Sequence, residues 1–220
     1  MKKLTLASLP ILAVIALIAS GCGGDTATNS QAARPKPTAE QLHVCPKSWR
    51  PSWQRLANRI DAPVYCPSWL PDPLPQLVSQ ALSDGSGGLP VSVSSDHSYL
   101  LSIAWAEPGS GEVHVNLRGY PGRTKVPTCI YEDYNKGKLY RKPVPCFADE
   151  RGTVQERGIT ATVYTVNQDA DLWHVLYAWH FRGGLYTVSE HVAQPLTYAK
   201  VTANLHRMLR GLVLVEPAAT

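Results

Sequence analysis

The stretch LWHVLYAWHFRGGLYTVSE, residues 172–190, carries large apolar side chains at every second position. In its first half these are Trp173, Val175, Tyr177, Trp179 and Phe181. A period of two is typical of a β-strand that turns one face toward a core. Arg182-Gly183-Gly184 then supplies a glycine-rich turn. The pattern predicts a hairpin of two antiparallel strands, over 172–181 and 185–190.

The same period of two recurs upstream of this hairpin. It appears over 99–105 and again over 113–117, with Pro108-Gly109-Ser110-Gly111 as a connecting turn. Residues 159–166 are rich in Thr and Val, which favour strands. Because these strands are joined by short turns, we expect an antiparallel meander sheet.

Helical spacing appears at both ends of this strand region. Ser52 precedes apolar residues spaced 3-4-3 up to Ile60, and a second short helix is predicted over 75–82. A longer helix is expected to start at Pro195 or Thr197, with Gly211 as its C-cap. Its apolar face comprises Tyr198, Val201, Leu205, Met208, Leu209 and Leu212. The proline-rich segment 64–74 should be extended and irregular. The predicted class is α+β, with the C-terminal helix packed on the aromatic face of the sheet.

The N-terminal residues are typical of an export signal. A basic start, Met1-Lys2-Lys3, precedes an uncharged run over 4–19 that is too short to span a bilayer. The run ends in Ile18-Ala19-Ser20-Gly21-Cys22. These residues resemble the lipobox of bacterial lipoproteins, although that family prefers Leu at the position of Ala19. The resemblance implies that Cys22 receives a diacylglyceryl group with acyl chains such as palmitate. It also implies that the protein is anchored to the cell membrane on its extracytoplasmic side.

Three segments follow from this reading. Residues 1–21 are the signal peptide, and residues 22–44 are a lipidated tether whose composition cannot bury enough surface to fold. Residues 45–216 form one α+β domain. The strand set, followed by Gly-Gly-Leu-Tyr at 183–186 and a helix, resembles uncharacterised actinobacterial lipoproteins. More distantly it resembles a domain of unknown function in Gram-positive exported proteins. The resemblance covers about residues 60–215 and implies no activity.

The remaining four cysteines indicate two disulfides. An even number of cysteines in an exported chain favours disulfide bonds, and three connectivities of Cys45, Cys66, Cys129 and Cys146 are open. Local loop closure favours Cys45–Cys66 and Cys129–Cys146. A zinc site is the competing use of four cysteines, but the sequence contains no Cys-x-x-Cys pair.

Composition and motifs exclude several function classes. Without Lys2 and Lys3 the chain carries 19 Lys and Arg against 17 Asp and Glu, too balanced for a nucleic-acid binder. No nucleophile elbow, His-Glu-x-x-His helix, P-loop or dinucleotide fingerprint is present. We therefore predict no catalytic residue, no cofactor and no enzyme activity.

Two patterns of histidine or acidic residues are candidate metal sites, but neither has the required spacing or ligands. His174 and His180 share a strand face but lie roughly 20 Å apart, so one ion cannot bind both. His180 and His191 would approach each other if the hairpin pairs them. Residues 167–171 alternate oxygen side chains but lack the glycine and distal glutamate of a calcium loop, so a turn is favoured. We predict no metal site.

The segment between Cys129 and Cys146 is the most unusual surface candidate. Its basic and aromatic side chains are Lys136, Lys138, Arg141, Lys142, Tyr131, Tyr134 and Tyr140. They predict either a patch for anionic envelope polymers or lipid head groups, or simply a solvated hairpin. We interpret the protein as a non-enzymatic surface lipoprotein that binds a partner or an envelope component. The alternative is a carrier of lipid or another apolar ligand on a sheet face of small residues such as Ser102, Ala104 and Ala178.

Overall fold

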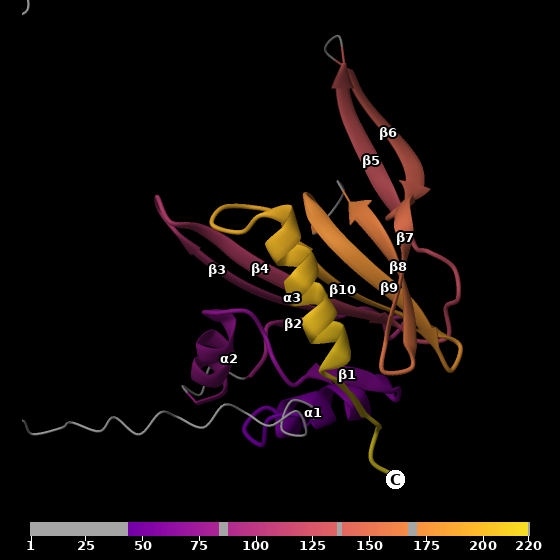
Figure 1. The fold of residues 1–220 in the computed structure, drawn as a ribbon. Coiled ribbons are helices and arrows are strands. Elements are labelled where there is room, and N and C mark those ends of the chain that lie inside the picture. The colour runs from indigo at the N-terminus through magenta and orange to yellow at the C-terminus, as the bar shows by residue number, and fades with distance from the viewer. Residues whose placement is uncertain (1–43, 84–87, 136–137, 167–170, 220) are drawn as a thin grey trace, which may run out of the picture. The chain divides into compact units, whose positions relative to one another are not determined.

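The computed structural model describes residues 44–83, 88–135, 138–166 and 171–219 (Figure 1). Within these ranges the α+β class is confirmed. The signal peptide, Cys22 and nearly all of the tether lie outside the described residues. The elements are α1 (Arg50–Ile60), β1 (Val64–Pro67), α2 (Leu74–Ser83), β2 (Val91–Val93), β3 (Tyr99–Glu107), β4 (Gly111–Tyr120), β5 (Thr128–Asn135), β6 (Lys138–Pro145), β7 (Asp149–Glu156), β8 (Ile159–Val166), β9 (His174–Phe181), β10 (Gly184–His191), α3 (Tyr198–Arg210) and β11 (Leu212–Val215).

The main sheet is built from two meanders. Its seven antiparallel strands follow the order β2-β3-β4-β10-β9-β8-β7. The run β2–β4 and the run β7–β10 each connect neighbouring strands in sequence. They meet where β4 pairs with β10, with Val115 opposite Glu190 and Tyr120 opposite Leu185. Strands β2 and β7 extend the predicted set at the two edges.

The C-terminal helix α3 covers the aromatic face of this sheet, as expected (Figure 1). Its side chains Val201, Leu205, Met208 and Leu209 are buried in one core with Tyr177, Trp179 and Tyr186 of β9 and β10. Tyr198, expected on the same apolar face, is 49% exposed. Thr197 caps the helix by accepting a hydrogen bond from the Lys200 backbone N–H at 3.2 Å. Gly211 ends it, and Leu212, predicted to belong to the helix, instead begins β11.

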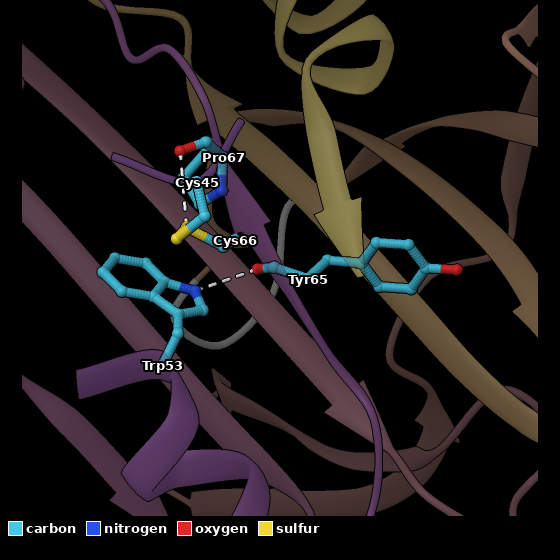
Figure 2. The surroundings of a disulfide bond; sticks show 5 residues. All are labelled: Cys45, Trp53, Tyr65, Cys66 and Pro67. Carbon is cyan, nitrogen blue, oxygen red and sulfur yellow. Dashed lines mark hydrogen bonds between the residues drawn. A yellow bond between two sulfur atoms is a disulfide. The ribbon is translucent and has the colours of Figure 1, made fainter. Parts of the chain in front are cut away.

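A separate two-stranded sheet, formed by β1 and β11, packs against the main core. Strand β1 pairs with β11, so part of the proline-rich segment expected to be irregular is a strand whose four residues are all buried. The Cys45–Cys66 disulfide ties the residues before α1 to β1. Figure 2 shows Trp53 of α1 beside this disulfide, its indole Nε1 donating to the Tyr65 carbonyl at 3.0 Å.

The opposite face of the sheet is covered only in part. A smaller core buries Leu176, Ala178 and Leu185 against Phe147, which follows Cys146. The part of the small-residue face around Leu176 and Ala178 is therefore closed. Farther along this face Ala104 is exposed and Ser102 is half-buried.

Strands β5 and β6 form a hairpin that projects away from the seven-stranded sheet (Figure 1). The Cys129–Cys146 disulfide joins its two ends, so both disulfides have the local pairing that loop closure favoured. Two disulfides indicate folding in an oxidising, extracytoplasmic environment. Among the described helices, none is both long and apolar enough to span a bilayer.

Candidate metal centre

The basic patch predicted from the sequence lies on the projecting hairpin. Lys138, Arg141 and Lys142 are exposed on β6. The Lys142 ammonium lies 5.2 Å from the centre of the Tyr131 ring, and Arg141 pairs with Glu132 at 2.6 Å. Tyr140 is exposed. Lys136 and the side chain of Tyr134 lie outside the described part of the hairpin.

A different group of residues converges at the junction of the two meanders. Arg182 and Gly183 both have positive φ angles, 46° and 76°, as a two-residue type I′ turn requires. Phe181 therefore pairs with Gly184, and the register places His191 directly opposite His174. The hairpin does not pair His180 with His191, because His180 pairs with Leu185 and is exposed.

His114 of β4 completes a group of three imidazoles. The candidate ligand nitrogens of His114, His174 and His191 all lie within 4.8 Å of one another. The His174 and His191 rings stack at 5.2 Å between centroids, and the His114 ring stands perpendicular to His174 at 4.9 Å. Nitrogen ligands of one tetrahedral zinc ion lie roughly 3.4 Å apart, given Zn–N bonds of about 2.0–2.1 Å. Modest side-chain rotations therefore bring the three nitrogens to one ion.

Glu112 adds a carboxylate at the more exposed side of the group. Its Oε1 lies 3.2 Å from His114 Nδ1 and 3.4 Å from His191 Nδ1. The His191 nitrogen is buried, and among the described residues it makes no hydrogen bond. The backbone N–H of Glu112 donates to the Gln194 carbonyl at 2.7 Å, which fixes the start of β4 against the segment after β10. A cation seated here would thus have a negative charge beside its imidazole ligands.

A buried polar layer lies behind the histidines. Asp171 precedes β9 and accepts hydrogen bonds from Asn116 Nδ2 at 2.9 Å and from Ser189 Oγ at 2.5 Å. Arg118 pairs with its other oxygen at 3.2 Å. Asn116 Oδ1 in turn lies 3.0 Å from His114 Nε2, and Ser189 Oγ lies 2.9 Å from His174 Nδ1.

The local environment keeps His174 neutral. The side chain is 2% exposed, and burial lowers the pKa of His174 to about 3, helped by His114, His191 and Arg118 nearby. A neutral imidazole retains one lone pair, which is what a metal ion needs. The arrangement therefore suits a first-row divalent ion bound by three imidazoles, with Glu112 as a further oxygen ligand.

Sequence reasoning missed this centre for two reasons. The separation of His174 from His180 excluded a site on one strand, but His114 lies in a distant hairpin that gave no metal-ligand spacing. Asp171 was interpreted as part of a turn, whereas it is 5% exposed and hydrogen-bonded at the sheet. Residues 167–170 of that segment lie outside the described ranges.

Comparisons with known proteins return no match for this chain, whether with protein-family models, with characterised proteins or with solved structures. The centre is therefore interpreted from its own chemistry.

Proposed function

We propose that this chain is a non-enzymatic, lipid-anchored surface protein whose folded domain binds a divalent transition-metal ion. The observation that carries the proposal is the convergence of His114, His174 and His191, whose ligand nitrogens lie within 4.8 Å of one another. The lipobox residues that end in Cys22 support the anchor, and the two disulfides support export. The protein would hold its ion outside the cytoplasmic membrane, at the end of a tether.

The donor set selects a class of ion. Imidazole nitrogen suits zinc, copper and nickel, whereas calcium and magnesium prefer sites made of oxygen ligands alone. Three imidazoles and one carboxylate therefore favour Zn²⁺ or Cu²⁺. We choose Zn²⁺ as the probe because it has no redox chemistry of its own.

Calorimetric titration of the chelator-treated full chain with Zn²⁺ tests the proposal. We expect one ion per chain, and we expect His191→Ala to weaken binding by about 100-fold or more, since it removes a direct ligand. His180→Ala is the matched control, because His180 is exposed on the same hairpin but lies roughly 20 Å along β9 from His174. The affinity of this variant should equal that of the wild type. Equal Zn²⁺ uptake by the wild type and by the variant with all three histidines replaced by alanine would refute the metal centre.

The β5–β6 hairpin supports a second candidate function, contact with anionic envelope polymer or lipid head groups. Its exposed side chains combine apolar and basic groups, with Ile130 at 59% and Tyr140 at 55% exposure beside Lys138 and Lys142. Exposed apolar side chains next to cations suit an anionic interface. The lipid on Cys22 would hold the hairpin near such a surface.

Charge reversal tests this second function. Replacing Lys136, Lys138, Arg141 and Lys142 by Glu should weaken binding of the chain, carrying Cys22→Ser, to vesicles with anionic lipid. Each basic residue near such a surface contributes on the order of 1 kcal/mol, so the loss at low salt should exceed 100-fold and shrink as salt rises. The control reverses four exposed charges elsewhere, at Lys47, Arg50, Arg59 and Lys200. Equal loss in both variants would show a general charge effect and not a hairpin site.

A further inference from the structure

Asp171 is the central acceptor of the polar layer behind the histidines. Its side chain is buried, and the guanidinium of Arg118 pairs with it at 3.2 Å. A carboxylate offers only acceptors, so every group that hydrogen-bonds to it must donate. Because Asn116 and Ser189 must donate to Asp171, their oxygens can only accept from the histidines His114 and His174.

The first relay runs through Asn116 to His114. Because Asp171 accepts, the amide nitrogen of Asn116 must face it, at 2.9 Å. The amide oxygen is thereby turned toward His114 Nε2, at 3.0 Å. An amide oxygen only accepts, so a hydrogen on Nε2 satisfies it, and the Ser102 hydroxyl, 2.8 Å from the same nitrogen, then accepts there as well. The lone pair of neutral His114 then lies on Nδ1, the nitrogen that faces Glu112.

The second relay runs through Ser189 to His174. The Ser189 hydroxyl has one hydrogen, and it is donated to Asp171 over 2.5 Å. Toward His174 the hydroxyl oxygen can therefore only accept, which places a hydrogen on Nδ1 at 2.9 Å. The lone pair of His174 then lies on Nε2. Both serine and histidine are fully enclosed, at 1% and 2% exposure, so water does not compete.

We infer that Asp171 is the positioning residue of the metal centre, which it prepares by fixing the tautomers of two ligands so that His114 presents Nδ1 and His174 presents Nε2. The consequence for metal binding rests on the proposed function, whereas the tautomers themselves exist in the metal-free protein. Groups that hydrogen-bond to a histidine ligand orient its ring and set which nitrogen binds. Here one buried carboxylate does this for two ligands on different strands.

Long-range ¹H–¹⁵N correlation spectra of the metal-free full chain, labelled at histidine and held at pH 8, report each tautomer directly. We expect His114 as the Nε2–H form and His174 as the Nδ1–H form. The opposite tautomer at either residue in the wild type would overturn the inference, whatever zinc does. Ser189→Ala removes one relay, and it should release His174 to the other tautomer or to a mixture while His114 is unchanged. Ser189→Thr restores the hydroxyl and should restore the wild-type spectrum.

Zinc affinity supplies the second readout. Ser189→Ala should bind Zn²⁺ about 10- to 100-fold more weakly, as is usual for the loss of a group that orients a ligand, and Ser189→Thr should recover most of the affinity. Unchanged affinity and unchanged tautomer in Ser189→Ala would overturn the inference. Asp171→Ala should affect both histidines together, and Ser189→Ala keeps the test valid if that variant does not fold. Expected tautomers in a wild type that binds no Zn²⁺ would confirm the relay and refute the proposed function.

Discussion

Gly111→Ala is expected to destabilise the domain by about 3 kcal/mol or more and to weaken Zn²⁺ binding. A Cβ atom at this position would lie 1.8 Å from the Gln194 carbonyl oxygen and 2.3 Å from its carbon, so the backbone must move. The φ angle of 97° adds strain for any residue with a side chain. The displaced contact is the one that fixes Glu112, so the carboxylate beside the histidines would shift with it.

Gly109 provides a matched control in the same turn. It also has a positive φ, 81°, but a Cβ there would meet nothing within 4 Å. Gly109→Ala should therefore cost only the conformational strain, about 1–2 kcal/mol, and leave Zn²⁺ affinity unchanged. Urea unfolding and zinc titration of both variants measure the difference. Similar stability for the two would show that the Gly111–Gln194 contact does not constrain the fold.

Trp53→Ala should destabilise the domain by about 3–5 kcal/mol, the usual cost of truncating a buried aromatic side chain to alanine. Trp53 is 1% exposed, stacks on Trp49 at 5.9 Å, and donates to the Tyr65 carbonyl next to the Cys45–Cys66 disulfide. The substitution leaves a cavity and an unpaired carbonyl. Trp53→Phe should cost less, because phenylalanine keeps most of the apolar contact; the remaining cost is that of the lost hydrogen bond.

Trp173 is the control for this substitution. It is 63% exposed, so Trp173→Ala removes little buried area and should change stability by less than about 0.5 kcal/mol. Urea denaturation at equilibrium compares the three variants. A loss for Trp53→Ala as small as that for Trp173→Ala would contradict the role of Trp53 in joining α1 to β1.

The parts of the fold that the sequence predicted are those with a strong local period. The alternation from Val175 to Phe181, the spacing of Leu205, Met208 and Leu209, and the position of Gly211 each depend on neighbouring residues alone. Trp173, predicted to begin this alternation, instead lies before β9 and is 63% exposed. Strands β1 and β11 were harder to predict, because Pro67 argues against a strand and Leu212 continues the helical pattern. Their pairing depends on residues at opposite ends of the domain.

The candidate centre depended on register, which a period of two does not supply. If Arg182, Gly183 and Gly184 all belong to the turn, each pair shifts by one residue and His191 no longer faces His174. With Arg182 and Gly183 alone as the turn, the two histidines are opposite. The two-residue turn forms because Arg182 and Gly183 both adopt positive φ, and a turn with this conformation fits the twist of the flanking strands. His114 enters only through the pairing of β4 with β10, which no local pattern indicates.

That pairing also determines when the centre can exist during folding. Strands β4 and β10 meet only after the long intervening chain, residues 121–183, has been brought back on itself, and closing such a loop is slow and entropically costly. His114 lies on one side of this closure, and His174 and His191 lie on the other. A chain whose meanders have formed separately therefore lacks the complete ligand set. An ion that binds only the joined sheet would favour it by mass action, so the proposed zinc ion would stabilise the pairing of β4 with β10.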